Sequence, residues 1–230
     1  MPPPYTALVF GGTGASGSAL VAALVSKPET WGPIIVPVRG DAPPSTSATV
    51  RFLPRTDFTR LDPSTLGPVD AAFICLGTTR AACGTAEAFE AADLHAPAAA
   101  AAAAVAAGAR SLGLVSAAGA ARGGWAPRAR LLHGFLYAAT KGAAEEAVLG
   151  AGAPSTFLYR PGLLARGESH TAGRPLERWA AALLPSLPVA DLAAAMVGDA
   201  EAALNSGRAA GEVVVGDREI KAKAAAAAGR

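Results

Sequence analysis

Apolar residues gather in short continuous runs along the whole chain, separated by polar and glycine-rich stretches. A continuous run, unlike an alternating one, is typical of a strand that is covered on both faces of a sheet. We therefore predict strands at Tyr5–Phe10, Ile34–Val38, Val50–Leu53, Ala71–Leu76, Ser111–Val115, Thr156–Tyr159 and Glu212–Val215. Longer segments with helical character lie between these runs, at Ser16–Ser26, Thr85–Ala107, Gly134–Gly150 and Pro188–Ser206.

Strands that alternate with helices form βαβ units, and such units build a parallel sheet with helices on both faces. The predicted fold class is therefore α/β, a doubly wound parallel Rossmann sheet of about seven strands. We expect residues 1–230 to form a single NAD(P)-binding domain, with 163–187 as a short C-terminal segment on the substrate side. The proline-rich connection 40–49 predicts an irregular crossover, and Pro37 predicts a bulge or an early strand end because it lacks a ladder donor.

The first apolar run leads directly into a glycine-rich loop, and the first predicted helix follows. In a dinucleotide-binding βαβ unit, successive glycines make the tight turn, let the backbone approach the pyrophosphate and allow the helix to pack closely. The helix N-terminus then offers free N–H groups and a partial positive charge to the phosphates. The predicted cofactor-binding residues of the loop are Gly11, Thr13, Gly14, Ala15, Ser16 and Gly17. A plain turn in a glycine-rich chain is the alternative, and no lysine follows as in a Walker-type NTPase.

Charge and composition exclude several other classes of protein. A formal net charge of +2 argues against nucleic acid as the main partner. The two cysteines, Cys75 and Cys83, and the three histidines have no metal-ligand spacing, so we expect no metal site. The cysteine usage also indicates a reducing compartment. We expect neither a transmembrane segment nor a signal peptide, because no apolar run is long enough and the N-terminus lacks a basic region.

A tyrosine and a lysine stand four residues apart in the helical segment 134–150. Residues at positions i and i+4 share one helix face, so Tyr137 and Lys141 can reach into one cleft. A neighbouring ammonium favours the phenolate, which suits the pair to acid–base chemistry. The alternative is a surface tyrosine and an unrelated lysine.

These motifs resemble the short-chain dehydrogenase/reductase superfamily over about residues 5–220. More narrowly, the chain is similar to the atypical branch that contains the Tat-interactive-protein oxidoreductases and their fungal mitochondrial relatives. The most branch-specific mark is the run Leu76-Gly77-Thr78-Thr79-Arg80. The other marks are the Gly11–Gly17 loop, Gly84, Ala88-Phe89, Asp93, Leu114-Val115-Ser116, Tyr137, Lys141-Gly142, Glu145 and Arg160-Pro161-Gly162.

The resemblance implies an acid/base role for Tyr137 toward the substrate oxygen. It implies that Lys141 holds the nicotinamide ribose and that a serine after the fifth strand hydrogen-bonds the substrate carbonyl. Ser116 is the hydroxyl at that place, and a strand-end cap of the local backbone is its alternative role. Many relatives carry a second serine that acts instead, and this chain has Ala117 there.

The end of the second strand bears on the choice of cofactor. An acidic residue there binds the ribose of NAD, whereas an arginine accommodates the 2′-phosphate of NADP. This chain has Arg39, with Asp41 two positions later, which favours NADP over NAD. The resemblance further implies cofactor contacts from Asp57, Phe58, Leu76, Gly77, Thr78, Pro161 and Gly162.

Two functions follow as hypotheses. The first is an NADPH-dependent oxidoreductase that transfers hydride to a small carbonyl or similar substrate. The second is a non-catalytic NADP-binding protein whose shape regulates a protein partner. The segment 119–136 is either a basic lid for an anionic substrate or a solvated variable loop. We expect a cytoplasmic location, with the surface of the mitochondrial outer membrane as the alternative. A homodimer or other protein partners are a further hypothesis.

Overall fold

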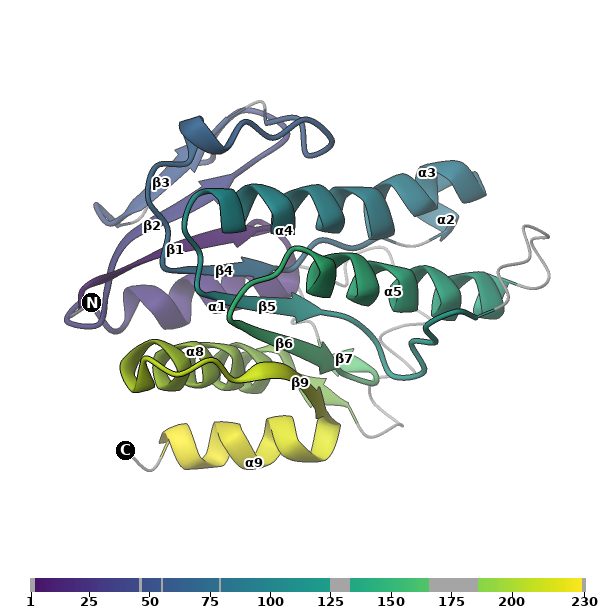
Figure 1. Ribbon diagram of the computed structural model, residues 1–230. Coiled ribbons are helices and arrows are strands. Elements are labelled where there is room, and N and C mark those ends of the chain that lie inside the picture. Colours follow the sequence, from purple (N-terminus) through teal and green to yellow (C-terminus); the bar gives the residue numbers. More distant parts are fainter. Residues whose placement is uncertain are drawn as a thin grey trace.

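The computed structural model describes residues 3–45, 47–54, 56–78, 80–124, 133–165 and 186–228. Its centre is a seven-stranded sheet in which all neighbouring strands are parallel (Figure 1). In sheet order the strands are β3 (Val50–Leu53), β2 (Trp31–Pro37), β1 (Tyr5–Phe10), β4 (Ala71–Ile74), β5 (Ser111–Val115), β6 (Ser155–Arg160) and β9 (Gly211–Gly216). The predicted α/β class with a doubly wound parallel sheet is confirmed.

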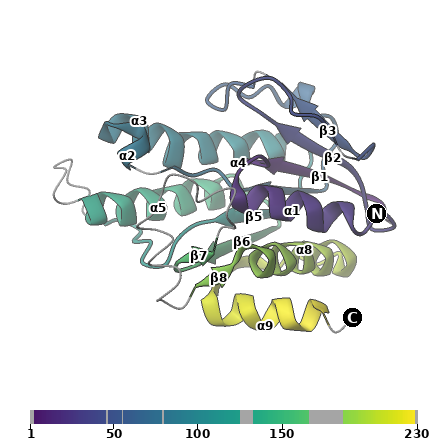
Figure 2. The ribbon, with the colours of Figure 1, turned by 180° about the vertical axis from the view of Figure 1, so that it is seen from behind.

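Helices cover both faces of the sheet, and each face has its own hydrophobic core. Helices α1 (Ala15–Val25) and α8 (Val189–Ser206) pack on one face, with Val9, Phe73 and Tyr159 in the core between them and the strands (Figure 2). Helices α4 (Ala96–Ala106) and α5 (His133–Gly150) pack on the other face, against Leu8, Ile74 and Leu112 among others. Successive strand residues therefore enter opposite cores, which explains why the strands are continuous apolar runs.

One predicted helix is divided in the structure. The segment expected as a single helix at 85–107 consists of α3 (Ala86–Glu90), a π-helical turn η2 (Ala91–His95) and α4. The short helix α2 (Arg80–Cys83) precedes it. A π turn inserts an additional residue into the helical winding, and such turns occur frequently at functional sites.

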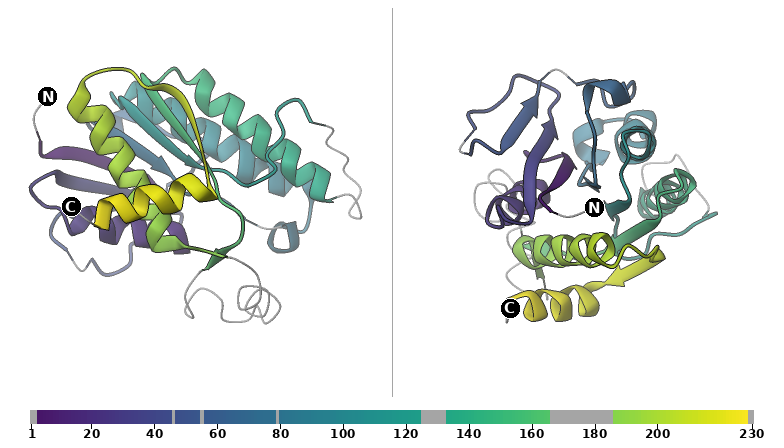
Figure 3. Two further views of the ribbon diagram at one scale, coloured as in Figure 1. Left: turned by 90° about the horizontal axis from the view of Figure 1, so that it is seen from below. Right: turned by 60° about the vertical axis from the view of Figure 1, so that its left-hand side comes forward.

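A C-terminal helix, α9 (Asp217–Ala228), was not expected from the sequence. It stacks on α8, on the side away from the sheet (Figure 3). Ile220 is its one fully buried hydrophobic residue among those described. The apolar signal of this segment is therefore weak, and the helix depends on packing against α8 and on acidic residues in its first turn.

The irregular features fall where the proline content predicts them. Pro37 is the last residue of β2, so the strand ends there, and the described part of 40–49 contains no helix. Most of the segment predicted to cover the substrate side, residues 166–185, lies outside the described residues. Its two ends meet as a small parallel sheet of β7 (Leu164–Ala165) and β8 (Leu187–Pro188). None of the described helices is long and apolar enough to cross a membrane.

Candidate functional site at the carboxyl edge of the sheet

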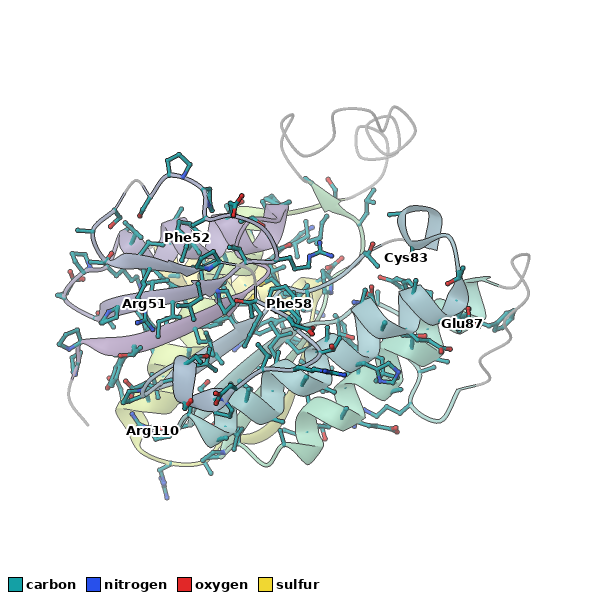
Figure 4. All side chains as sticks on the ribbon, turned by 90° about the horizontal axis from the view of Figure 1, so that it is seen from above. Arg51, Phe52, Phe58, Cys83, Glu87 and Arg110 are labelled. Atoms are coloured by element: carbon teal, nitrogen blue, oxygen red, sulfur yellow. The ribbon has the colours of Figure 1, made fainter. Side chains whose placement is uncertain are left out.

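The carboxyl ends of the strands form the edge at which the predicted site residues collect. The chain order reverses between β1 and β4, because β2 and β3 lie on one side of β1 and the later strands on the other. In open parallel sheets, ligands bind outside the carboxyl ends of the strands at such a switch point. Figure 4 shows the two ends of the molecule: Cys83, on α2 beyond this edge, and Arg110, which precedes β5 at the opposite edge.

The glycine loop joins the end of β1 to the start of α1. Gly11 has a φ of +77°, and a Cβ atom there would lie 2.6 Å from the Cys75 carbonyl oxygen at the end of β4. Gly14 caps α1 without a side-chain hydrogen bond, and the first turn of that helix carries no acidic residue. The positive end of the α1 dipole is therefore not compensated within the first turn, which favours an anion there. Thr13 and Gly14 are exposed, and Ser16 is half-buried.

The ends of β2 and β3 bring three further predicted residues to the same edge. Arg39 is exposed two residues after the end of β2. The Thr56 N–H donates to the Val38 carbonyl oxygen at 2.8 Å, which draws the segment carrying Asp57 and Phe58 toward Arg39. The Phe58 ring meets Phe10 of β1 edge to face, with 6.1 Å between ring centroids.

Asp57 accepts hydrogen bonds from its neighbour Thr59. Its Oδ1 atom accepts from the Thr59 hydroxyl at 2.7 Å and from the Thr59 N–H at 2.9 Å. These two hydrogen bonds lower the pKa of Asp57 below its usual value. The Asp57 carboxylate is therefore ionised at neutral pH, and the two hydrogen bonds from Thr59 hold its orientation.

The segment after β4 lies against Lys141 of α5. Lys141 Nζ is 2.7 Å from Asp93 Oδ1, and both side chains are almost entirely buried. The other carboxylate oxygen, Asp93 Oδ2, accepts the Thr78 N–H at 2.8 Å. A Cβ atom on Gly77 would lie 3.6 Å from both Lys141 Nζ and Asp93 Oδ1. Gly77 itself is exposed and has no side chain, so its backbone lies directly over the ion pair.

Tyr137 lies one helical turn before Lys141 on α5. It is half-buried, and its ring is 6.0 Å from that of Phe89, with 31° between the ring planes. Phe89 is fully buried and belongs, with Leu136 and Ala86, to a small apolar cluster between α3 and α5. The structure thus brings Tyr137 and Lys141 to one region in the first half of α5, beside the α3 helix.

The Ser116 hydroxyl is hydrogen-bonded to a buried carboxylate. Its hydroxyl donates to Glu145 Oε1 at 2.6 Å, and its N–H donates to the Tyr159 carbonyl oxygen at 2.7 Å. Neither contact is a cap of the local backbone by the side chain. The Ser116 hydroxyl would have to leave Glu145 in order to donate to a substrate, and the next residue, Ala117, has no hydroxyl.

Glu145 is the centre of a cluster of charges at the ends of β5 and β6. It accepts from Arg160 Nε at 2.8 Å and pairs with Arg122 Nε at 3.3 Å, and Arg122 also pairs with Glu212 of β9. Burial opposes ionisation of Glu145, but the hydrogen bonds from Arg160 and Ser116 and the charges of Arg160 and Arg122 outweigh it. The pKa of Glu145 is consequently lowered from its usual value.

Pro161 and Gly162 follow β6 at the same edge. The Pro161 carbonyl oxygen accepts the Ala118 N–H at 2.9 Å, which joins the segments after β5 and β6. Gly162 is turned toward the start of α9: its N–H donates to Asp217 Oδ1 at 2.9 Å. A Cβ atom on Gly162 would meet Asp217 Oδ2 at 2.9 Å, so this glycine serves the contact with α9.

Asp93 and Glu145 are site residues to which the sequence patterns assigned no role. Each is a charged residue in a helical segment with apolar residues one turn away, such as Phe89 before Asp93 and Val148 after Glu145. That signal predicts a buried charge, but it does not identify the partner. The partners come from β4, α5 and β6, which are distant in sequence.

Two other predictions lie partly outside the described residues. The middle of the basic segment 119–136, residues 125–132 with Trp125, Arg128 and Arg130, is not described, whereas the Arg122 guanidinium pairs with Glu145 and Glu212. Among the described residues, no group of three or more histidine, cysteine, aspartate or glutamate side chains could hold a metal ion.

Solved structures with the same fold include several with a bound nicotinamide dinucleotide. MoeE5 in complex with UDP-glucose and NAD has a TM-score of 0.68 at 20% identity, covering 97% of this chain and 82% of that chain. DesIV, a dTDP-glucose 4,6-dehydratase from Streptomyces venezuelae with NAD bound, has a TM-score of 0.66 at 20% identity, covering 97% and 81%. A short chain dehydrogenase from Burkholderia cenocepacia J2315 in complex with NADP has a TM-score of 0.67 at 18% identity, covering 98% and 95%.

These likenesses show that the chain has the same fold as these proteins, and at such identities they show the fold alone. Neither a scan of protein-family models nor a search of curated protein sequences finds a match. Membership of the narrower branch that the motifs resemble therefore stays a prediction.

Proposed function

We propose that this protein is an NADPH-dependent oxidoreductase of the short-chain dehydrogenase/reductase type that acts on a small carbonyl or similar group. The observation that carries the proposal is the buried Lys141 ammonium, which lies under the exposed Gly77 and one helical turn from Tyr137. The glycine loop after β1 lies next to β4, at the same edge. A fold of this kind holds NAD or NADP in the solved structures named above.

The residues of this edge fit a dinucleotide. Gly14 and Gly77 leave backbone open where a Cβ atom would otherwise project, and α1 presents uncompensated N–H groups to a pyrophosphate. Phe58, beside β1, offers an aromatic surface to the adenine. Arg39 is exposed at the end of β2, where a guanidinium can grip a 2′-phosphate with two parallel hydrogen bonds, so we propose NADP rather than NAD.

When bound, the dinucleotide would supply the hydride. In this proposal Tyr137 donates the proton to the substrate oxygen, and Lys141 binds the ribose hydroxyls and stabilises the phenolate that remains. Ser116 could assist the substrate oxygen only by releasing Glu145. Tyr137 would then carry most of the interaction with that oxygen.

Substitution of Tyr137 by phenylalanine tests this assignment. The change removes one hydroxyl and keeps the ring that packs against Phe89. We expect turnover of a confirmed carbonyl substrate to fall at least about 100-fold, the usual contribution of a positioned proton donor. NADPH affinity, measured by calorimetry, should stay within a factor of two to three. Unchanged turnover by the variant would remove Tyr137 from the reaction.

A second function has a specific observation in its favour. The Ser116 hydroxyl is bound to Glu145, and Ala117 offers no replacement, so the site lacks a hydroxyl directed at a substrate from this segment. A non-catalytic protein that binds NADP and regulates a partner would need no such hydroxyl. A screen of carbonyl compounds beside an NADPH titration separates the two functions, because tight binding without any turnover would favour the second.

A further inference from the structure

The ion pair between Asp93 and Lys141 joins three parts of the site in the protein interior. Asp93, in the π turn η2, contacts Lys141 of α5 through Oδ1 at 2.7 Å and the backbone after β4 through Oδ2 and the Thr78 N–H. The Asp93 side chain is fully buried, and that of Lys141 is 8% exposed. One carboxylate therefore fixes an ammonium and the Gly77–Thr78 segment to each other.

Stability alone does not account for such a pair. Removing two charges from water costs several kcal/mol for each ion, and replacing a buried pair by apolar groups is often neutral or stabilising. The pair also lies at the sheet edge, under a loop whose exposed glycine carries no side chain. An ion pair that only stabilised the fold would not require an exposed glycine beside it.

The geometry of the contact leaves the ammonium able to serve another acceptor. Although Lys141 Nζ is close to Asp93 Oδ1, that oxygen accepts no hydrogen bond of suitable geometry among the described residues. An ammonium has three N–H donors. The carboxylate thus holds the ammonium by charge beside Gly77, and among the described residues no other acceptor binds the Lys141 N–H groups.

We propose that Asp93 is a positioning residue, which holds the Lys141 ammonium under Gly77 so that its N–H groups bind the hydroxyls of the ribose nearest the nicotinamide. This inference rests on the proposed function, because it requires a dinucleotide at this edge. Asp93 does not touch the ligand and acts through Lys141. Asp93 lies within the π turn η2, between α3 and α4.

Calorimetric titration of Asp93→Asn with two ligands tests the proposal. NADPH reaches the ammonium, whereas adenosine 2′,5′-bisphosphate, its adenine half, lacks the ribose in question. We expect the variant to bind NADPH about tenfold more weakly, as for the loss of a hydrogen bond to a charged group. Its affinity for adenosine 2′,5′-bisphosphate should equal that of the wild type. Equal NADPH affinity, or an equal loss for both ligands, would overturn the positioning role.

Asp70→Asn is a matched control. Asp70 is also a buried aspartate that accepts a backbone N–H, from Thr6 at 2.9 Å, and pairs with a cation, Arg110, at 3.1 Å. It lies at the amino edge of the sheet, far from the candidate site. This variant should lose stability in thermal unfolding and keep both affinities. A similar selective loss of NADPH binding in Asp70→Asn would attribute the effect to general loosening and overturn the proposal.

The Lys141→Met background keeps the test decisive if Asp93→Asn alone does not fold. Methionine removes the ammonium, so Asp93 can no longer act through it, and the added Asp93→Asn change removes the carboxylate left without a partner. The double variant should bind NADPH as Lys141→Met does. A further loss of affinity would overturn the proposal. If the wild type binds neither ligand, the proposed function itself fails. If the wild type binds both ligands and Asp93→Asn binds them equally well, only the positioning role of Asp93 fails.

Discussion

The glycines of the first loop act on the fold and on the candidate site in different ways. A Cβ atom on Gly17 would lie 2.1 Å from the Gly11 carbonyl oxygen, which is backbone and cannot rotate away. A Cβ atom on Gly14 would have only that same oxygen within 4 Å, at 3.4 Å, so the loop has room for it. Gly17 is therefore needed for the fold, and Gly14 is available for a ligand.

Alanine substitutions at these two glycines should separate stability from binding. We expect Gly17→Ala to lower the free energy of unfolding by about 3 kcal/mol or more, because the backbone must shift to relieve the overlap. Gly14→Ala should change it by less than about 1 kcal/mol and weaken NADPH binding by crowding the pyrophosphate. Chemical denaturation and calorimetry measure the two effects. A Gly14→Ala variant with unaltered affinity would place the phosphates elsewhere.

At the scale of elements, the Glu145 cluster ties together the helix and strands that surround the site. Glu145 of α5 receives Ser116 from the end of β5 and Arg160 from the end of β6, and Arg122 connects the cluster to β9. Gly142 of α5 allows the segment after β5 to approach, since a Cβ atom there would lie 2.2 Å from the Ala121 carbonyl carbon. The position of Lys141 and Tyr137 thus depends on contacts one turn further along α5.

Substitution of Glu145 by glutamine should destabilise the protein in a pH-dependent manner. The change leaves Arg160 without its carboxylate and Arg122 with Glu212 alone, at a cost of about 2 kcal/mol, because both guanidinium groups are partly hydrated. Since the pKa of Glu145 is lowered in the folded state, its contribution is present above the usual value of 4.5 and is lost as the pH falls below it. The stability difference between wild type and variant should therefore shrink on acidification.

Glu146→Gln is the control for this measurement. Glu146 is the next residue on α5 and is exposed, so its change should alter stability by less than about 0.5 kcal/mol. Urea denaturation of the three proteins between pH 3 and 7 measures the effect. A stability difference for Glu145→Gln that grows on acidification would contradict the ionised state of Glu145 in the folded protein.

At the scale of the whole molecule, the candidate site extends across the carboxyl edge from β2 to α5. Arg39 and Phe58 lie at one end of this edge and Lys141 at the other, with the glycine loop between them. A dinucleotide that binds along the edge would contact elements from both sides of the switch point. Because such a ligand binds only the folded chain, it should stabilise the molecule as a whole.

NADPH should raise the unfolding temperature more than NADH does. At a concentration of about 100 Kd, a ligand adds about 2.7 kcal/mol, which raises the unfolding temperature of a chain of this size by roughly 5–10 °C. Differential scanning fluorimetry checks the difference between the two cofactors. Arg39→Ala should lower the shift with NADPH to that with NADH, because Arg39 is proposed to bind the 2′-phosphate. Equal shifts in the wild type would argue against a preference for NADP.

The sequence by itself determined the fold class and the order of the strands along the chain. Continuous apolar runs report burial on both faces, and alternation with helices requires parallel pairing, so local patterns suffice for both conclusions. The glycine loop and the Tyr137–Lys141 spacing were visible for the same reason, since each depends on residues close in sequence. The helix α9 was not visible, because its apolar signal is nearly confined to Ile220.

Only the tertiary structure decided which charges meet. Ser116 has the same position in the chain whether its hydroxyl faces a substrate or Glu145, and Asp93 resembles any acidic residue of a helix until Lys141 lies beside it. Ser116 and Glu145 are 29 positions apart in the chain, and Asp93 and Lys141 are 48 positions apart. Electrostatic contacts act through space, so their partners follow from the way α5 packs beside β4, β5 and β6.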